Sequence, residues 1–332
     1  MSKSHIFAGK PGGKPASPFA PDPRLDMALR NIGFNGVGAS DAPPLTMPQS
    51  APRPPAGAPA TVQLQRREWL LEAMEAQRGL STFASGLPRV RGLSSQDFLD
   101  HFYAPGRPVV IEGAISGWPA LERWTPDYLR RAIGNAPVEY QYNRNSSPDF
   151  ELYKDNHCRT GPFGEFMDLV EAPGAANNVY LTAYNSRVNG PALAPLMADV
   201  APISAYLTEA TGMLWIGPAG TFTPLHFDVT NNLLAQITGQ KQIILIPPSE
   251  TRHMAHNRHV FSDVHDIESA QHLARHPQAR NVRRYEVILS PGDLLYIPVG
   301  WWHQVRSLDF SVMMTSTNFL WPNTAWESFP KS

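Results

Sequence analysis

The sequence has little cysteine and no excess of charge of either sign. Its one cysteine, Cys158, among 332 residues excludes an internal disulfide, and such a composition is typical of a reducing compartment. Lys and Arg number 28 against 29 Asp and Glu, which gives a formal net charge of -1. Because there is no basic excess, the overall charge favours neither a nucleic acid nor an anionic membrane as a partner.

Long hydrophobic runs are also missing. No segment approaches the roughly 20 apolar residues that span a bilayer. The N-terminus carries Lys3 and Lys10 without the apolar run of a signal peptide. We therefore expect a soluble, cytoplasmic protein with no membrane partner. Hydrophobic residues nevertheless make up 42% of the chain, which is enough for a sizeable buried core.

Proline is concentrated at the start of the chain. Residues 1–60 hold 12 of the 33 prolines, with glycine and alanine between them. This segment lacks the periodic apolar residues whose burial offsets the entropy of ordering a chain. We predict that residues 1–61 form a mostly disordered Pro/Gly/Ala-rich arm.

Residues 62–178 combine helical patterns with a few strand-like runs. The first sixteen alternate charged and apolar residues at near-helical spacing. Ser94 followed three positions later by Asp97, and Thr125 followed by a proline, are patterns that begin helices. The runs RPVVIEG and VEYQY indicate strands. We predict that this region is the helical and mixed α/β N-terminal part of one catalytic domain.

Residues 179–332 change character and become a series of short apolar runs separated by glycine and proline. Examples are VYLTAY, MLWIG, QIILIPP and YEVILSPGDLLYIP. Several short strands at this spacing indicate an all-β sandwich or a small barrel. An insertion at about residues 251–280 interrupts the pattern and holds six of the 11 histidines. Since it has no cysteine, we expect a solvated or substrate-covering loop there rather than a zinc site.

A histidine and an aspartate stand two positions apart in the run TPLHFDVTNNLLAQITGQKQIILIPP. In a strand, positions i and i+2 share a face, so His226 and Asp228 present an imidazole and a carboxylate side by side. Alone, the pair also fits a plain hydrogen bond. His303, far downstream after a glycine and two tryptophans, adds a third candidate. Two histidines and one carboxylate form the facial triad of non-haem Fe(II) oxygenases.

Several motifs together resemble the JmjC domain. GTFTPLHFDVTNNLLAQITGQKQIILIPP, LSPGDLLYIPVGWWHQV and MTSTNF are similar to its cupin-like branch, which includes the asparaginyl hydroxylase of hypoxia-inducible factor. The similarity extends upstream to RPVVIEGAISGWPALERW and covers roughly residues 85–321. The resemblance implies a mainly β protein with flanking α-helices, built on a double-stranded β-helix core of the jelly-roll or cupin kind.

The resemblance also implies a cofactor and two co-substrates. Fe(II) would be held by His226, Asp228 and His303, with 2-oxoglutarate and O2 as co-substrates. Matching family positions imply 2-oxoglutarate or metal contacts for Thr223, Lys241, Asn232, Asn318 and Tyr180. From the residues alone, a lysine that begins an apolar strand either extends to the surface or meets an anion. The tyrosine is the loosest match, because Tyr184 lies close by.

The activity implied is hydroxylation of a C–H bond by an Fe(II)- and 2-oxoglutarate-dependent dioxygenase. We expect the substrate to be an amino-acid side chain of a protein or peptide. A small molecule or a modified tRNA base is an alternative, although the near-neutral charge gives RNA no support. A non-catalytic cupin binding module is a third reading. The oligomeric state stays open, with a homodimer among the alternatives.

Overall fold

The computed structural model describes residues 59–80, 86–256 and 259–330. All of them belong to one unit of mutual contacts, residues 44–332. The arm predicted for residues 1–61 lies outside the described residues, except where helix α2 (Pro59–Arg78) begins. No helix in the described ranges combines the length and the apolar character that crossing a bilayer requires.

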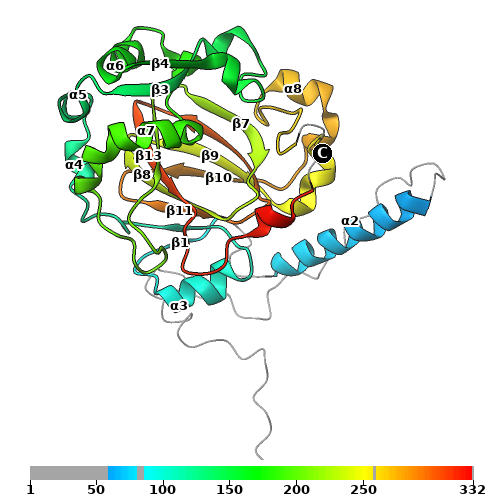
Figure 1. The fold of residues 1–332 in the computed structure, drawn as a ribbon. Coiled ribbons are helices and arrows are strands. Elements are labelled where there is room, and N and C mark those ends of the chain that lie inside the picture. Colours follow the sequence, from blue (N-terminus) through cyan, green and yellow to red (C-terminus); the bar gives the residue numbers. More distant parts are fainter. Residues whose placement is uncertain (1–58, 81–85, 257–258, 331–332) are drawn as a thin grey trace, which may run out of the picture. The chain divides into compact units, whose positions relative to one another are not determined.

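Two β-sheets form the core (Figure 1). The larger sheet has, in spatial order, β1 (Arg89–Val90), β2 (Val109–Ile111), β11 (Leu294–Ile297), β8 (Asn232–Thr238), β13 (Ser311–Ser316) and β6 (Met213–Gly217). The smaller sheet has β10 (Tyr285–Leu289), β9 (Lys241–Ile246), β12 (Trp302–Ser307) and β7 (Phe222–Phe227). Neighbouring strands are antiparallel, except that β1 and β2 are parallel. This arrangement confirms the predicted jelly-roll core and the mainly β fold class.

The two sheets pack face to face, because one buried cluster draws residues from both. On β9, Ile243 and Leu245 lie in that cluster, whereas Ile244 and Ile246 lie in a separate cluster on the opposite face. Side chains of a strand alternate between faces. Lys241 has the parity of Ile243, so its side chain enters the space between the sheets, where it is fully buried.

The turn between β8 and β9 requires glycine. Gly239 has a φ of 68°, in the left-handed region. A Cβ at this position would lie 2.1 Å from the carbonyl oxygen of Phe310. Only glycine meets both conditions without a large strain. The turn therefore fixes where β9 begins, and with it the position of Lys241 at the start of that strand.

A third sheet and several helices accompany the core. Its three strands are, in order, β4 (Cys158–Pro162), β3 (Pro137–Tyr142) and β5 (Val179–Tyr180). The α-helices are α3 (Ser95–Phe98), α4 (Ala120–Arg123), α5 (Pro126–Ile133), α6 (Phe163–Glu171), α7 (Ser186–Leu193) and α8 (Ala270–Arg275). The shorter helices include η1 (Leu99–Tyr103), η7 (Pro248–His253), η8 (Pro277–Ala279) and η9 (Ala325–Ser328). Helix α6 packs on the third sheet through Phe166, whose ring lies 5.0 Å from that of Tyr140.

The helix starts read from the sequence are present. Ser94 caps α3, and its hydroxyl accepts a hydrogen bond from the backbone N–H of Asp97 at 3.1 Å. Thr125 caps α5 in the same way and accepts from the backbone N–H of Tyr128 at 3.3 Å. Gly134 follows the last residue of α5 with a φ of 61°. These helix ends could be predicted from the sequence because each cap is formed by residues only a few positions apart.

The division expected at residue 179 does not separate the sheets. Strands β1 and β2 precede it, yet both belong to the larger core sheet, where β2 pairs with β11. Strand β5 follows it, yet pairs with β3 outside the core. The expected boundary followed a change in the apolar pattern of the chain. Sheet membership depends instead on hydrogen bonds between strands that are distant in sequence.

The histidine-rich insertion packs against the smaller sheet through a few apolar residues, in contrast to the solvated loop expected there, while the alternative of a substrate-covering loop stays a prediction. Met254, Val264 and Ile267 are buried with Trp302 on the outer face of the smaller sheet. The backbone N–H of Leu225 on β7 donates to the carbonyl of His265 at 2.8 Å. Apolar residues recur every few positions among the many histidines. Because these residues are buried, the segment covers one face of the sheet.

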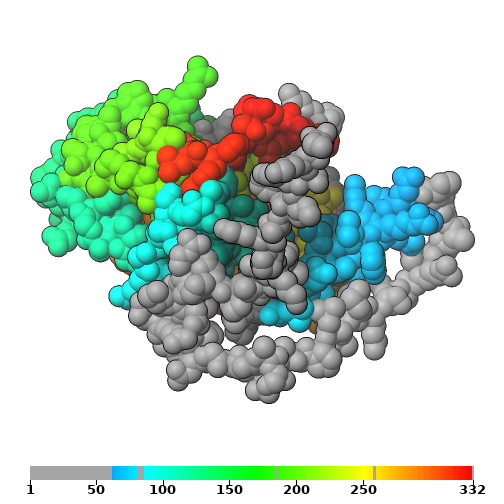
Figure 2. Space-filling view, turned by 90° about the horizontal axis from the view of Figure 1, so that it is seen from below, coloured from blue at the N-terminus to red at the C-terminus, as the bar shows by residue number. Residues whose placement is uncertain are grey.

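The C-terminal segment lies at the surface beside α3 and η1 (Figure 2). The ring of Trp321 lies 5.7 Å from that of Phe98 and 5.1 Å from that of Tyr103. The hydroxyl of Tyr103 donates to the carbonyl of Pro322 at 3.1 Å. These contacts fix the course of the chain after β13, close to the loop that follows β7, as described below.

Candidate metal and co-substrate site

Two histidines and one aspartate come together at one end of the smaller sheet. His226 on β7 and His303 on β12 are directly paired in the antiparallel register. Nε2 of His226 lies 3.9 Å from Oδ1 of Asp228, and Nε2 of His303 lies 3.7 Å from Oδ2. One potential ligand atom from each residue lies within 4.8 Å of the other two. Among the described residues, this is the group of His, Cys, Asp or Glu side chains placed to share a metal ion.

Backbone carbonyls orient both imidazoles. Nδ1–H of His226 donates to the carbonyl of Pro224 at 2.8 Å, and Nδ1–H of His303 donates to that of Trp301 at 3.0 Å. A proton on Nδ1 leaves Nε2 with its lone pair free toward the aspartate. Hydrogen bonds of this kind fix the tautomer and the ring orientation of metal-binding histidines.

Burial keeps the inner histidine neutral. It is the largest effect that lowers the pKa of His303, to about 4, and the charge of His226 acts in the same direction. The neutral imidazole is the form that binds a metal. Two imidazole nitrogens and one carboxylate fit the donor set of an Fe(II) facial triad. The side chain of Asp228 is 29% exposed and that of His303 is 5% exposed, so the group opens on the aspartate side.

Asn232 holds the aspartate. Its Nδ2 donates to Oδ2 of Asp228 at 3.1 Å, and the backbone N–H of Gly300 donates to the aspartate's carbonyl at 3.0 Å. Oδ1 of Asn232 is buried and has no hydrogen-bond partner in the described part of the chain. A buried acceptor without a donor is costly. The structure thus places Asn232 beside the triad and leaves one of its acceptors available.

Lys241 and Tyr180 also meet. Both side chains are fully buried, and Nζ of Lys241 donates to the phenol oxygen of Tyr180 at 2.8 Å. Burial lowers the pKa of Lys241 to about 7. Among the described residues, no carboxylate is paired with this ammonium. An anion that reached it would gain a strong charge-assisted hydrogen bond.

The two remaining candidates differ. Thr223 lies on β7 opposite Val305 of β12 and is buried between the triad and the lysine. Asn318 does not join this group through a hydrogen bond. Its Nδ2 donates to Oγ1 of Thr208 and to the carbonyl of Glu209, each at 3.3 Å. The structure therefore collects seven of the eight candidate residues and gives Asn318 other partners.

Sequence reasoning missed a buried arginine behind Tyr180. Arg144 is fully buried, and its guanidinium lies 5.1 Å from the centroid of the Tyr180 ring. It donates to Oε1 of Glu151 at 2.6 Å and to the carbonyl of Phe222 at 3.0 Å, and it also contacts Asn177. Phe222 precedes Thr223. Arg144 thus supports two proposed co-substrate residues at once, and its sequence surroundings, YQYNRNSS, carry no pattern that signals this role.

A second missed group joins the loops that carry the ligands. Oδ1 of Asn231 accepts from the hydroxyl of Tyr296 at 3.0 Å and from the backbone N–H of Val299 at 2.9 Å. Its own backbone N–H and carbonyl bond the side chain of Asn323 at 2.8 and 2.9 Å. Asn231 therefore ties the loop after Asp228 to the loop before His303 and to the C-terminal segment.

Comparison with known proteins agrees with this geometry. Residues 95–325 match the cupin-like domain family. The chain belongs to the JmjC group of cupin-like proteins. It is 32% identical over 232 residues to Jumonji C domain-containing protein 5 of Drosophila melanogaster, which covers 67% of this chain and 57% of that protein. It is 33% identical over 249 residues to lysine-specific demethylase 8 of Xenopus tropicalis, which covers 71% of this chain and 53% of that protein.

A third relative is named for a different activity. The chain is 27% identical over 263 residues to tRNA wybutosine-synthesizing protein 5 of Homo sapiens, which covers 74% of this chain and 81% of that protein. The chain spans little more than half the length of the first two relatives. The JmjC family is one of Fe(II)- and 2-oxoglutarate-dependent oxygenases, so the predicted family is confirmed. These matches do not specify the asparaginyl hydroxylase branch.

Proposed function

We propose that this chain is an Fe(II)- and 2-oxoglutarate-dependent dioxygenase that hydroxylates a C–H bond of an amino-acid side chain in a protein or peptide. The observation that carries the proposal is a row of groups on the inner face of the smaller sheet. His303, Val305 and Ser307 follow one another on that face of β12, and Lys241 pairs with Ser307. The lysine therefore stands about 13 Å along the strand from the triad.

This row suits a molecule with two different ends. The ketone and the 1-carboxylate of 2-oxoglutarate would reach the metal at His226, Asp228 and His303. The distal carboxylate would reach Lys241 and Tyr180, with the hydroxyl of Thr223 between the two ends. Bound together, Fe(II), 2-oxoglutarate and O2 supply an oxidant that inserts one oxygen atom into a C–H bond and leaves succinate and CO2.

The residues of the chain do the positioning. Asn232 holds the carboxylate of Asp228 in place, and the buried walls of the sheet interior exclude water from the lysine end. The more exposed side of Asp228 is the side from which a substrate side chain would approach. Such an opening suits a residue presented on a peptide, because a bulky polymer can remain outside while one side chain enters.

The relatives support two substrate classes. One is named a lysine-specific demethylase, which favours a protein substrate. Another is named a tRNA wybutosine-synthesizing protein and aligns over 81% of its length, so a modified tRNA base is the second candidate. A net charge of -1 provides no general attraction for the RNA backbone, and we therefore favour the protein or peptide.

The direct test measures substrate oxidation. Purified protein is loaded anaerobically with Fe(II) and 2-oxoglutarate and then exposed to O2 with candidate peptides or tRNA. Succinate release and a mass gain of one oxygen atom on the substrate are followed together. We expect both in the wild type and neither in His226→Ala or Asp228→Ala. Full turnover in both variants would show that the triad is not the metal centre.

A further inference from the structure

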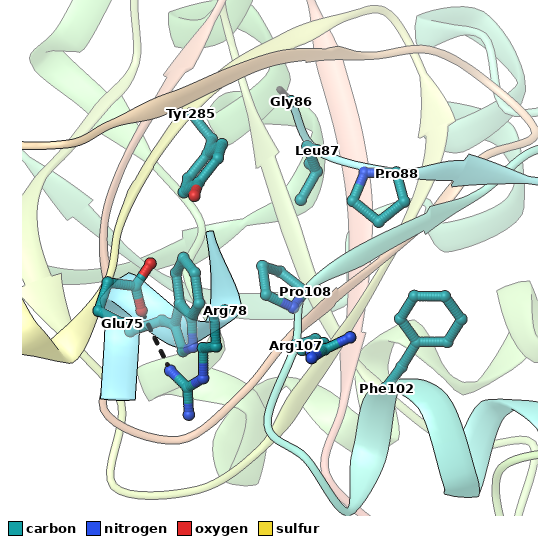
Figure 3. Close-up of a pocket in the computed structure, with 10 residues that line it drawn as sticks. Glu75, Arg78, Gly86, Leu87, Pro88, Phe102, Arg107, Pro108 and Tyr285 are labelled. Carbon is teal, nitrogen blue, oxygen red and sulfur yellow. Dashed lines mark hydrogen bonds and ion pairs between the residues drawn. The ribbon is translucent and has the colours of Figure 1, made fainter. Parts of the chain in front are cut away.

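A pocket lies where the end of α2 meets the core, next to Trp301 (Figure 3). The cavity measures about 50 Å³. Its position is outside the row of groups between the sheets, and none of the proposed metal or co-substrate residues lines it. Its lining combines charged side chains from α2 and from the segment before β2 with apolar side chains from the core.

Positive charge exceeds negative charge at this pocket. Glu75 on α2 is buried and is shared by two arginines, Arg78 at 3.3 Å and Arg283 at 2.9 Å. Arg107 adds another cation on the pocket wall. The pocket wall therefore carries two guanidinium groups, Arg78 and Arg107, and one carboxylate, Glu75, while Arg283 contacts Glu75 from outside the lining. Figure 3 shows Arg78 and Arg107 on one side of the pocket, with Tyr285 across from them.

Arg107 is the group that needs an anion. Within the described residues, its guanidinium makes no hydrogen bond and no ion pair, although it is only partly exposed. Burial is the largest effect that lowers the pKa of Arg107, and repulsion by Arg78 lowers it further, whereas attraction by Glu75 raises it. Because the carboxylate of Glu75 is bonded to Arg78 and Arg283, it offsets the burial of Arg107 only in part, and an anion that paired directly with Arg107 would be favourable.

The remaining walls are apolar. Leu87, Pro88 and Pro108 line the pocket together with the indole of Trp301. Nε1 of Trp301 donates to the carbonyl of Gly106 at 3.1 Å, which anchors the indole next to Arg107. A planar guanidinium matches a carboxylate in two parallel hydrogen bonds. An aromatic or aliphatic body attached to that carboxylate would lie against the apolar walls.

We propose that this pocket is a binding site for a small carboxylate with an apolar body, held by Arg107 and Arg78 against Trp301. The carboxylate group pairs with the guanidinium of Arg107, which has no partner in the described chain. The ligand is either a free organic acid or the C-terminal carboxylate of a peptide that ends in an apolar residue. The site is separate from the proposed co-substrate site, so it holds whether or not the chain oxidises a substrate.

The experiment uses benzoate as the free-acid probe and benzamide as its neutral match. Both are titrated into the full-length protein by calorimetry at pH 7.5. We expect benzoate to bind about tenfold or more tightly than benzamide, because only benzoate forms charge-assisted hydrogen bonds. Equal affinity for the two probes, or no binding of benzoate, overturns the proposal.

Two further arms locate the site and identify the source of the carboxylate. The indole N–H signal of Trp301, assigned with Trp301→Phe, should shift with benzoate in nuclear magnetic resonance spectra. The dipeptide acetyl-Leu-Phe is compared with its C-terminal amide. If the free dipeptide binds as tightly as benzoate, the site accepts a peptide terminus. If benzoate alone binds, the site is for a free acid. A shift of other tryptophan signals without Trp301 would place the ligand elsewhere and refute the proposal.

Arg107→Met is the decisive variant, because it keeps most of the stem and removes the charge. It should lose most of the preference for benzoate over benzamide. Arg131→Met, at an exposed arginine on α5, is the matched control and should bind like the wild type. Thermal unfolding of both variants confirms that they are folded. Unchanged benzoate affinity in a folded Arg107→Met protein would disprove the assignment.

Discussion

Two fully buried cations, Arg144 and Lys241, lie close to the ring of Tyr180, and they differ in their partners. Arg144 has the carboxylate of Glu151 at 2.6 Å and also bonds a backbone carbonyl and an amide. Lys241 has one neutral partner, the phenol of Tyr180. The arginine therefore has an anionic partner within the chain, although its buried Nε has no hydrogen-bond partner among the described residues, whereas the lysine lacks an anion. This difference indicates which of the two cations is structural and which is reserved for a ligand.

The largest expected effect comes from removing Arg144, the cation that has a carboxylate partner in the chain. Arg144→Met should destabilise the fold by about 3–5 kcal/mol, because the side chain of Glu151, which is only 13% exposed, would lose its partner. Urea unfolding of the wild type and variant measures this difference. The double variant Arg144→Met/Glu151→Leu should recover much of the loss. A single variant as stable as the wild type would remove the distinction between the two cations.

Removing the other cation should affect binding rather than stability. Lys241→Met should leave the free protein at least as stable at pH 8. The folded-state pKa is near 7 and the unfolded value is 10.5, so burial of this lysine costs stability at pH values below 10.5. Affinity for 2-oxoglutarate, measured by anaerobic calorimetry with Mn(II) in place of Fe(II), should fall roughly 30- to 100-fold. Unchanged affinity would transfer the role to another group.

The next largest expected effect is on metal binding, and it comes from Asn231, which connects the loops that carry the ligands. Asn231→Ala removes the acceptor for Tyr296 and Val299 and should weaken Mn(II) binding about tenfold, as measured by electron paramagnetic resonance. Asn231→Asp retains both acceptor bonds and should bind Mn(II) at least as well as the wild type. Equal weakening in both variants would mean that these two bonds do not position the ligands. This readout is independent of turnover.

The smallest expected effect is the uptake of a proton when 2-oxoglutarate binds. At pH 8 the ammonium of Lys241 is mostly deprotonated in the free protein, since burial places its pKa near 7. A bound carboxylate favours the charged form, so 2-oxoglutarate binding at pH 8 should take up close to one proton, and binding at pH 6 should take up almost none. Calorimetry in two buffers with different ionisation enthalpies measures this uptake. Arg144, with its own carboxylate, should contribute nothing.

The two cations also differ in how much of their roles could be predicted from the sequence. From the residues alone, Lys241 was expected either to extend to the surface or to meet an anion, and the resemblance to the JmjC domain implied its co-substrate role. Helix caps and a core of short β-strands were predictable because each depends on a short pattern, and the resemblance implied the jelly-roll topology. Arg144, Asn231 and Asn323 were not predictable. Apart from Glu151, seven positions after Arg144, most of their partners lie tens of residues away, and no local sequence pattern indicates such contacts.

Two expectations were revised by packing. The boundary at residue 179 followed hydrophobicity, but β2 joins the core sheet because it pairs with β11. The prediction for the histidine-rich insertion depended on its polar residues, whereas its sparse apolar residues are buried against the sheet. In both cases the deciding interaction lies outside the window that a local pattern samples.

The pairing of His226 with His303 has a consequence for how the protein reaches its native state. The two imidazoles face each other only after β7 and β12, which are distant in sequence, have paired. Closing so long a loop is slow, so the ligand set cannot exist in an early folding intermediate. An ion bound to both strands would bind only the folded protein, and it would therefore shift the folding equilibrium toward the paired sheet. Iron supply and folding would then be coupled in the cell.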